Sequence, residues 1–280
     1  MDAVPAALSS LAAVPEVAEV TERAREACTR LRWHQALRRR IPEAAAESRV
    51  RGAWASAELD GARNNVDIVR DLMRGAREWP EALDPAERVL RGAVNATAET
   101  EHVAGLVLTS PMQALARLHV AAASDLVESS AALGRPRLGD ESCGELVDLG
   151  EPVPPAQIRG RLDGVVALLS APGAPALLVA ALVHAEIATI RPFTHGNGLV
   201  ARAMERAIIK ASGLDPTGVA VPEAGHGAEG GPAYLGSLAA YATGGREGVL
   251  LWLTHAGGAV EAAAGEGLVI ADAVLAGRLS

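Results

Sequence analysis

Apolar and polar residues alternate with a helical period along most of the chain. Between residues 64 and 82, for example, Val66, Val69 and Met73 recur at the spacing of three and four residues that places side chains on one face of an α-helix. The same spacing predicts a helix over most of the remaining sequence. The predicted helices cover residues 17–40, 43–59, 64–82, 86–98, 111–133, 157–169, 174–190, 200–211, 234–241 and 249–264.

Residues typical of helix ends support this pattern at two places. Gly61 follows the segment 43–59 and is placed to end that helix, since glycine readily adopts the left-handed conformation found after many helices. Asp84 and Pro85 precede the segment 86–98, where aspartate suits an N-cap and proline suits the first helical position. The chain is therefore expected to be mainly α-helical.

The segment 134–155 departs from this periodicity. Glycine, proline, aspartate, glutamate and serine interrupt its short apolar pieces, such as residues 145–149. This pattern is typical of either a loop or a short β-hairpin.

The charge of the chain argues against nucleic acid as a partner. The formal net charge is -8 and the sequence pI is near 5.4, so the field of the whole molecule repels phosphate backbones. The densest basic cluster, residues 38–40, is followed by Glu43 and Glu47. A solvated helix face explains this cluster better than a nucleic-acid patch does.

Three further features predict a cytoplasmic protein. Cys28 and Cys143 are far apart and form no metal-binding or redox spacing, so we expect reduced thiols. Residues 1–17 contain no basic residue ahead of their apolar positions, which argues against a secretion signal. The uncharged stretch 164–183 is broken by two prolines and a glycine at residues 172–175, so we expect no membrane span.

A short motif between two predicted helices offers a site for an anion. Residues 189–202 read TIRPFTHGNGLVAR. The backbone amides of Gly196 and Gly198 can point inward because no side chain obstructs them, and the helix that follows adds unpaired N–H groups and its positive dipole end. Asn197 tolerates left-handed backbone angles. The motif therefore predicts a phosphate-binding loop.

Two side chains of the motif fit this interpretation. Phe193, the only phenylalanine of the chain, can pack beneath the loop and hold it rigid. Arg202, one turn into the helix, can point its guanidinium back toward the same space. Taken alone, the Gly-Asn-Gly tripeptide favours a simple turn between helices, with Phe193 filling space in the core.

Residues 181–214, ALVHAEIATIRPFTHGNGLVARAMERAIIKASGL, resemble the signature of the Fic (Fido-domain) family, H-x-F-x-D/E-G-N-G-R-x-x-R. Members of this family are mainly helical, and many transfer AMP from ATP to a hydroxyl side chain of a target protein. The resemblance extends to PVPPAQIRGRLDGVVALL before the signature and to AYLGSLAAY after it. It implies a Fic-like helical bundle in which residues 134–149 form a short β-hairpin flap, before the central helix pair, that positions the target segment.

A second resemblance lies upstream. Ser56, Asp60 and Gly61 resemble the family's inhibitory motif, S/T-x-x-x-E-G/N, with Asp60 in the place of glutamate. In the family that carboxylate pairs with the second arginine of the signature, here Arg202, and blocks productive ATP binding. A plain helix C-terminus explains the same residues equally well. The resemblance divides the chain into an N-terminal helical region with a candidate inhibitory helix (1–84), a Fic-like core (85–270) and a tail (271–280).

Three positions of the signature differ in this chain. Arg191 stands where the family has the histidine that accepts a proton from the attacking hydroxyl, and a guanidinium stays protonated at cellular pH. His195 replaces the acidic residue that holds Mg²⁺, and imidazole is a poor ligand for this hard ion. Leu199 replaces the first arginine, which removes a phosphate contact worth roughly 1.5–3 kcal/mol. The sequence therefore predicts neither a metal site nor Mg²⁺ as a cofactor.

These observations predict a Fic-family protein that binds ATP or another nucleotide phosphate but transfers AMP slowly or not at all. The expected phosphate-binding residues are Gly196, Asn197, Gly198, Arg202 and Arg191. One alternative is an active transferase of AMP or another phosphate-containing group, in which His195 serves as a displaced base.

Another alternative is a non-catalytic protein-interaction module. The resemblance implies a protein target or regulatory partner and leaves the oligomeric state open. For His184 and Glu186, on the preceding helix, we expect structural roles.

Overall fold

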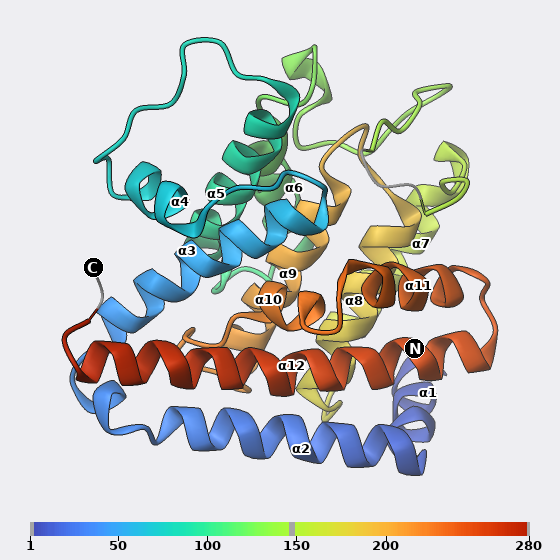
Figure 1. Cartoon of the computed structure of the whole chain (residues 1–280). Coiled ribbons are helices and arrows are strands. Elements are labelled where there is room, and N and C mark those ends of the chain that lie inside the picture. Colours follow the sequence, from blue (N-terminus) through green and yellow to red (C-terminus); the bar gives the residue numbers. More distant parts are fainter. Residues whose placement is uncertain (1–2, 146–148, 279–280) are drawn as a thin grey trace.

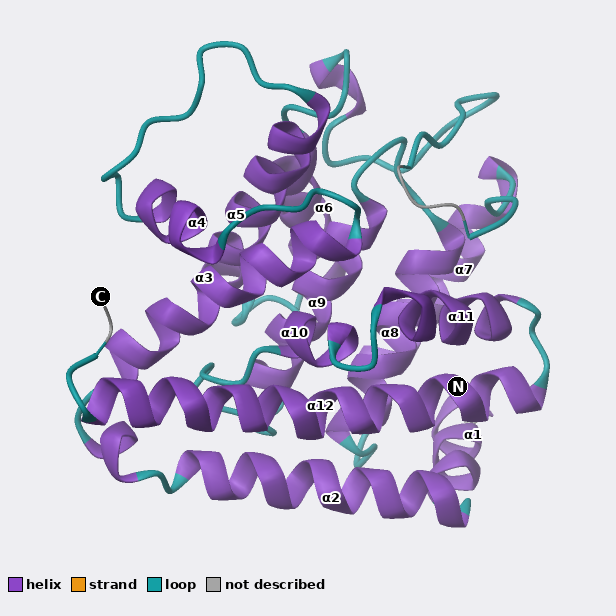
Figure 2. Ribbon diagram, viewed as in Figure 1, coloured by secondary structure: helices purple, strands orange, loops and turns teal. Residues whose placement is uncertain are grey.

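The protein is a bundle of helices in a computed structural model that describes residues 3–145 and 149–278 (Figures 1 and 2). Helices account for all the regular secondary structure of these described residues. The α-helices are α1 (Ala3–Ala12), α2 (Pro15–Arg32), α3 (Ile41–Leu59), α4 (Val66–Met73), α5 (Pro85–Val103), α6 (Pro111–Ala123), α7 (Pro155–Leu169), α8 (Ala176–Ile190), α9 (Asn197–Ala211), α10 (Pro222–Gly227), α11 (Gly231–Ala242) and α12 (Arg246–Leu275). Two short 3₁₀ helices, η1 (Gln35–Arg38) and η2 (Ser130–Ala132), complete the set.

The helices α8 and α9 pack against each other at the centre of the bundle. Nearly every residue of α8 is buried, and so is all of α9 except Gly198, Lys210 and Ala211. Helices α5 and α6 contact α9 on one side, while α11 and α12 contact α8 on another. The loop between α8 and α9 is therefore held from several directions.

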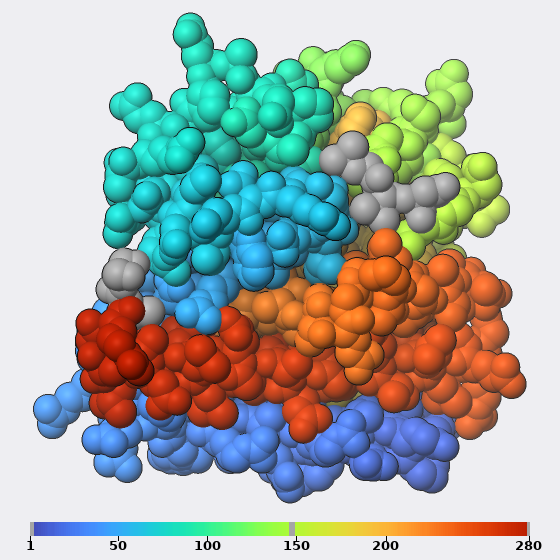
Figure 3. All heavy atoms as spheres, viewed as in Figure 1, coloured from blue at the N-terminus to red at the C-terminus, as the bar shows by residue number. Residues whose placement is uncertain are grey.

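The longest helix, α12, lies alongside α2 at one edge of the bundle (Figure 1). In the space-filling view their atoms form two adjoining bands, blue for α2 and orange to red for α12 (Figure 3). The contact is close because Gly257 of α12 faces Val20 of α2, where a Cβ on the glycine would stand 2.6 Å from the valine Cβ. Small residues thus let these two helices approach.

The helix ends predicted by Gly61 and by Asp84-Pro85 are confirmed. Helix α3 ends at Leu59, and Gly61 follows with a φ of 84°. Asp84 caps α5 by accepting the Glu87 N–H at 2.8 Å, and the Glu87 carboxylate accepts the Asp84 N–H at 2.9 Å. Both ends follow from local chemistry, and both helices extend as the periodicity indicates.

Other helices differ from the predicted bounds. The predicted helix 17–40 ends at Arg32, because His34 turns to an extended ψ of 139° and its ring accepts the Ala36 N–H, which starts η1. The predicted helix 64–82 ends at Met73, close to Gly75 with its φ of 72°. Helix α6 ends at Ala123 instead of continuing to residue 133.

Two helices were not predicted, and a third is longer than predicted. Helices α1 and α10 were not expected, and α12 continues to Leu275. None of the helices in the described residues meets the length and hydropathy needed to cross a bilayer singly. The pair α1 and α2 meets them only when taken together, and it is bent by 83°.

The β-hairpin expected over residues 134–149 is wrong for the part of this segment that is described, which contains no strand; residues 146–148 lie outside the description. The backbone of this segment makes a tight turn at residues 138–141 and otherwise bonds to the α8–α9 loop, so it has no paired strands. The Arg137 N–H donates to the Pro192 carbonyl at 2.7 Å, and the Gly144 N–H donates to the Thr194 carbonyl at 2.7 Å. We call the described residues 134–145 and 149–154 the covering loop.

The contact between α2 and α12 gives a matched stability test. Gly257→Ala forces a Cβ against Val20 and is expected to lower the free energy of unfolding by about 1–3 kcal/mol. Gly258→Ala, next to it on the same helix, meets nothing within 4 Å and should instead raise it by roughly 0.5–1 kcal/mol through helix propensity. Urea unfolding of both variants measures the difference, and equal midpoints would contradict the close contact.

Candidate anion-binding site

The loop between α8 and α9 is built on two left-handed residues. Arg191, which ends α8, has a φ of 47° and a ψ of 66°, and it is the single non-glycine residue with positive φ in the described parts of the chain. Gly196 has a φ of 77° and immediately precedes α9. A left-handed arginine costs roughly 1–2 kcal/mol, so the surrounding contacts must hold this turn in place.

Asn197 and Phe193 fix the shape of the loop. The Asn197 Oδ1 accepts the Phe193 N–H at 2.8 Å, and its Nδ2 donates to the Phe193 carbonyl at 2.9 Å. The Phe193 ring stacks on His119 of α6 at a centroid distance of 3.8 Å and an interplanar angle of 5°. Phe193 is thus buried beneath the loop, and its stacking partner is an imidazole.

The first amide of α9 already holds an anion. The Asn197 N–H donates to Oε1 of Glu145 at 2.9 Å, and the Asn197 side-chain amide donates to the same oxygen. Glu145 belongs to the covering loop. The positive end of α9 therefore binds a carboxylate of its own chain, as expected for a helix N-terminus.

Glu145 has an unusual protonation equilibrium. Its pKa is raised to about 7, first by burial and then by the nearby Asp60 carboxylate, while the hydrogen bonds from Asn197 and the charge of Arg191 act in the opposite direction. The raised pKa means that the site holds this carboxyl group near the point where its charge is gained or lost at neutral pH.

Arg202 of α9 points into the same space and is almost completely buried. Its Nη2 lies 2.7 Å from Oδ1 of Asp60, its Nε donates to the Ser56 hydroxyl at 2.8 Å, and its Nη1 donates to the Tyr234 hydroxyl at 3.3 Å. Burial alone would lower the pKa of Arg202, but Asp60 and Tyr234 outweigh this effect and raise it. The guanidinium is therefore fully charged and fully satisfied.

Gly198 is the position where the ion pair of Asp60 and Arg202 needs space. A Cβ at Gly198 would stand 2.9 Å from the Asp60 carboxylate and 3.2 Å from the Arg202 Nη1. The second glycine of the Gly-Asn-Gly motif is therefore required by the close packing of the end of α3 against the start of α9. Gly61, directly after Asp60, lets the chain leave this point in a left-handed turn.

The remaining cavity is small. It has a volume of about 20 Å³ and is lined by Asp60, Glu145, Arg191, Arg202 and Tyr234 among others. A single water needs about this much space, whereas a phosphate group needs several times more. The amide of Asn197 and the guanidinium of Arg202 thus lie at one cavity, but each already binds a carboxylate of the same chain.

Arg191 lies at the edge of this cavity and is 6% exposed. Its Nη2 donates to the Gly150 carbonyl of the covering loop, while its buried Nε has no hydrogen-bond partner among the described residues. The side chain ties the covering loop to the end of α8 and keeps one donor unused. The predicted cation at the loop's edge is therefore present.

His195 and Leu199 line a second small cavity, of about 40 Å³, together with Asp60 and Glu145. The His195 ring lies against Gly144, where a Cβ would stand 2.6 Å from its Nε2, and its buried Nδ1 has no partner in the described structure. Burial lowers the pKa of His195, although the charge of Glu128 opposes this. Leu199 is buried, with its Cδ1 3.1 Å from the Cβ position of Gly92.

The structure brings most of the sequence-predicted residues together around one small cavity: Asp60, Arg191, Asn197, Gly198 and Arg202 line it, with Ser56 and Phe193 directly behind. Two residues that line the cavity, Glu145 and Tyr234, were not predicted from the sequence. Glu145 lies in an irregular segment, where periodicity gives no orientation. Tyr234 lies in the stretch that resembles the family's tail, which was the one signal that pointed to it.

The fold and the site define a class of protein: an all-helical bundle whose central pair of helices encloses an anion-binding turn. Residues 111–209 match the Fic/DOC family. This part of the chain therefore belongs to the Fic/DOC family. No curated protein sequence matches it.

Solved structures of Fic proteins share this fold. A Fic family protein from Desulfovibrio desulfuricans has a TM-score of 0.72 and 18% identity, over 91% of this chain and 75% of that one. Fic-1 from C. elegans has a TM-score of 0.68 and 17% identity, over 90% and 72%. A Fic domain containing signaling protein from Bacteroides thetaiotaomicron has a TM-score of 0.64 and 13% identity, over 90% and 97%.

The raised pKa of Glu145 predicts a pH-dependent stability. Between about pH 4.5, the usual pKa of the group, and pH 7, folded protein keeps a proton that unfolded chain releases, so this contribution to stability is lost as pH rises. Glu145→Gln removes this titrating group and with it this pH-dependent contribution to stability. The free energy of unfolding of the variant minus that of wild type should therefore increase from pH 4.5 to 7.5 in urea titrations.

The exposed Glu58 of α3 supplies the control for this measurement. Glu58→Gln should give a flat difference over the same pH range. A flat difference for Glu145→Gln as well would contradict the raised pKa of that buried carboxyl group.

Proposed function

We propose that this Fic-family protein is a nucleotide-phosphate-binding protein whose site is held closed by its own Asp60 and Glu145 carboxylates, with AMP transfer slow or absent. The single observation that carries this proposal is that both anion-binding elements, the first amide of α9 and Arg202, hold a carboxylate of the same chain. Groups that bind one oxyanion in this geometry suit another, since amides and guanidinium bind phosphate in the same way.

Closure by Asp60 agrees with the resemblance of Ser56, Asp60 and Gly61 to an inhibitory motif. Aspartate reaches Arg202 in spite of its shorter side chain, because Gly198 allows it to approach. Closure by Glu145 comes from the covering loop and adds a second carboxylate at the same cavity. A nucleotide therefore has to displace both groups before its phosphates reach the amide and the arginine.

Slow transfer follows from the side chains at the reacting centre. Arg191 is a permanent cation where the family has a base, and its Nη2 is engaged by the covering loop. The α8–α9 loop offers His195 in place of an acidic ligand for Mg²⁺, and its unbonded Nδ1 is buried. Loss of a general base by itself slows a reaction roughly 100- to 10,000-fold.

Calorimetric titration with ATP tests the closed site. Asp60→Asn keeps the size of the side chain beside Gly198 but removes the charge that competes with phosphate. ATP should bind this variant about 10-fold more tightly than wild type or better, because one charge-assisted contact at Arg202 becomes available. Asp71→Asn, which removes an exposed carboxylate paired with Arg74 on α4, should bind ATP as wild type does.

Two results would overturn the proposal. If wild type and Asp60→Asn bind ATP with equal affinity, the carboxylate does not close the site. If ATP binds neither Asp60→Asn nor its combination with Glu145→Gln, the loop is not a phosphate site, and a protein-interaction module becomes the better explanation.

The lost base is tested by restoring it. In the Asp60→Asn background, Arg191→His with His195→Asp should incorporate AMP into protein roughly 100-fold faster or more than Asp60→Asn alone, with Mg²⁺ present. Leu199 is kept, because it is buried beside Gly92 and an arginine there would disturb the core. Equal incorporation by both variants would mean that another group, such as His195, serves as the base.

A further inference from the structure

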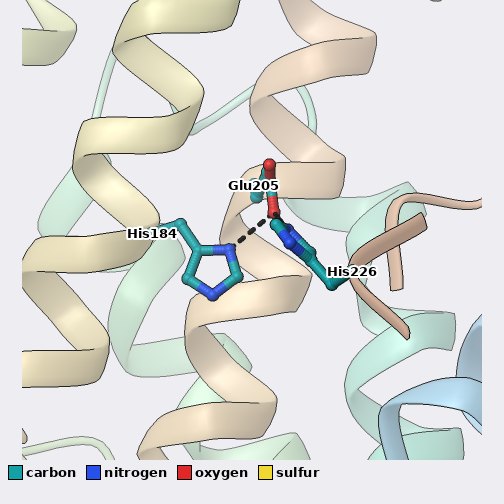
Figure 4. Close-up of side chains that lie close together, drawn as sticks. All are labelled: His184, Glu205 and His226. Carbon is teal, nitrogen blue, oxygen red and sulfur yellow. Dashed lines mark hydrogen bonds and ion pairs between the residues drawn. The ribbon is translucent and has the colours of Figure 1, made fainter. Parts of the chain in front are cut away.

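Three buried side chains with metal-binding atoms converge in the core behind the anion-binding site (Figure 4). His184 comes from α8, Glu205 from α9 and His226 from α10. The His184 Nδ1 and the His226 Nε2 each lie 2.6 Å from Oε2 of Glu205. All three side chains are fully buried, and their nearest ligand atoms lie within 4.8 Å of one another. We call this group the His-Glu-His cluster.

Among the described residues, the carboxylate of the cluster is bonded by the two imidazoles, which form an ion pair with it only when protonated. The two arginines nearest to Glu205 along α9 are engaged elsewhere, Arg202 with Asp60 and Arg206 with Glu223. In addition, Oε1 of Glu205 is buried without a hydrogen-bond partner among the described residues. Burying a carboxylate that lacks a paired cation is costly. The cluster therefore has a place for one positive charge and one unused oxygen ligand.

The far side of each imidazole is held by another side chain. The His184 Nε2 lies 2.9 Å from the Tyr234 hydroxyl, and the His226 Nδ1 lies 3.2 Å from the His255 Nε2. The Trp252 ring stacks on His226 at a centroid distance of 5.6 Å. Metal-binding histidines are usually oriented in this way by a hydrogen bond to their second nitrogen and by an apolar surround.

We propose that the His-Glu-His cluster is a site for a divalent transition metal ion of the zinc type, with the His184 Nδ1, the His226 Nε2 and the Glu205 carboxylate as ligands and a fourth position for water. Two imidazoles and a carboxylate form a donor set that suits Zn²⁺ and excludes Mg²⁺, which requires oxygen ligands. The ion supplies the missing positive charge and uses the unbonded Oε1.

Metal binding requires a small rearrangement. Ligand atoms around tetrahedral zinc are roughly 3.3 Å apart, given Zn–N and Zn–O distances near 2.0–2.1 Å, whereas the imidazole nitrogens lie 2.6 Å from the carboxylate here. Glu205 must therefore draw back slightly. A surface groove of about 620 Å³ is lined by His255 and Gly225, and it brings solvent close to His226.

Metal titration of the whole chain tests the site. After dialysis against a chelator, one equivalent of Co²⁺ should produce visible absorption bands typical of a tetrahedral site. Zn²⁺ at roughly 100 times its dissociation constant should raise the melting temperature by about 5 °C or more, and Mg²⁺ should not. Glu205→Gln and His226→Gln should lose the Co²⁺ bands, and His255→Gln should weaken Zn²⁺ binding about 10- to 100-fold.

His102→Gln is the matched control, since it removes an exposed histidine on α5 and should leave metal binding unchanged. The proposal is overturned if wild type gives no Co²⁺ bands and no stabilisation by Zn²⁺, because the cluster is then a hydrogen-bonded network only. It is also overturned if all variants bind the ion equally, which indicates surface binding. If Glu205→Gln fails to fold, His255→Gln and the comparison of Zn²⁺ with Mg²⁺ still decide.

Discussion

The positive charge that α9 carries into the interior is the constraint on which the site depends. The helix starts with an amide that needs an acceptor, and one turn later Arg202 points into the same buried space. Buried charge must be compensated, and here the compensation comes from two other segments, Asp60 at the end of α3 and Glu145 in the covering loop. One electrostatic requirement therefore draws three distant parts of the sequence to a single point.

A continuous series of polar contacts joins this site to the His-Glu-His cluster. Arg202 donates to the Tyr234 hydroxyl, which also lies 2.9 Å from His184, and His184 contacts Glu205. Tyr234 is thus shared between the two sites. A change in the charge state of either site alters the hydrogen bonds available to Tyr234, so the fold provides a physical link between the anion-binding surface and the core.

The composition of the chain explains where this polar core can exist. Aromatic residues make up 2% of the sequence, and most of the bundle is held by small side chains that let helices approach closely. The large buried rings Trp252 and Tyr234 are concentrated around the His-Glu-His cluster. Large aromatic side chains therefore enclose the two imidazoles and the carboxylate, while small side chains fill most of the remaining core.

The sequence by itself determined the helical class, the capped ends at Gly61 and Asp84, and the residues of the α8–α9 loop. These features depend on side chains a few positions apart, whose geometry follows from the helix itself. It also pointed to Asp60 through its resemblance to a motif. The same local rules left a loop or a hairpin open for residues 134–145, and the hairpin implied by the family resemblance is wrong there, because the segment bonds to carbonyls of a loop some 50 residues away.

Only the tertiary structure decided that Glu145 occupies the first amide of α9, that Phe193 stacks on His119, and that His184, Glu205 and His226 meet. The sequence separation of these residues is large, and neither periodicity nor spacing carries information about it. What brings them together is the packing of α6, α8, α9 and α10 around one core. The chemistry of each residue could be read from the chain, but its partner was fixed by the fold.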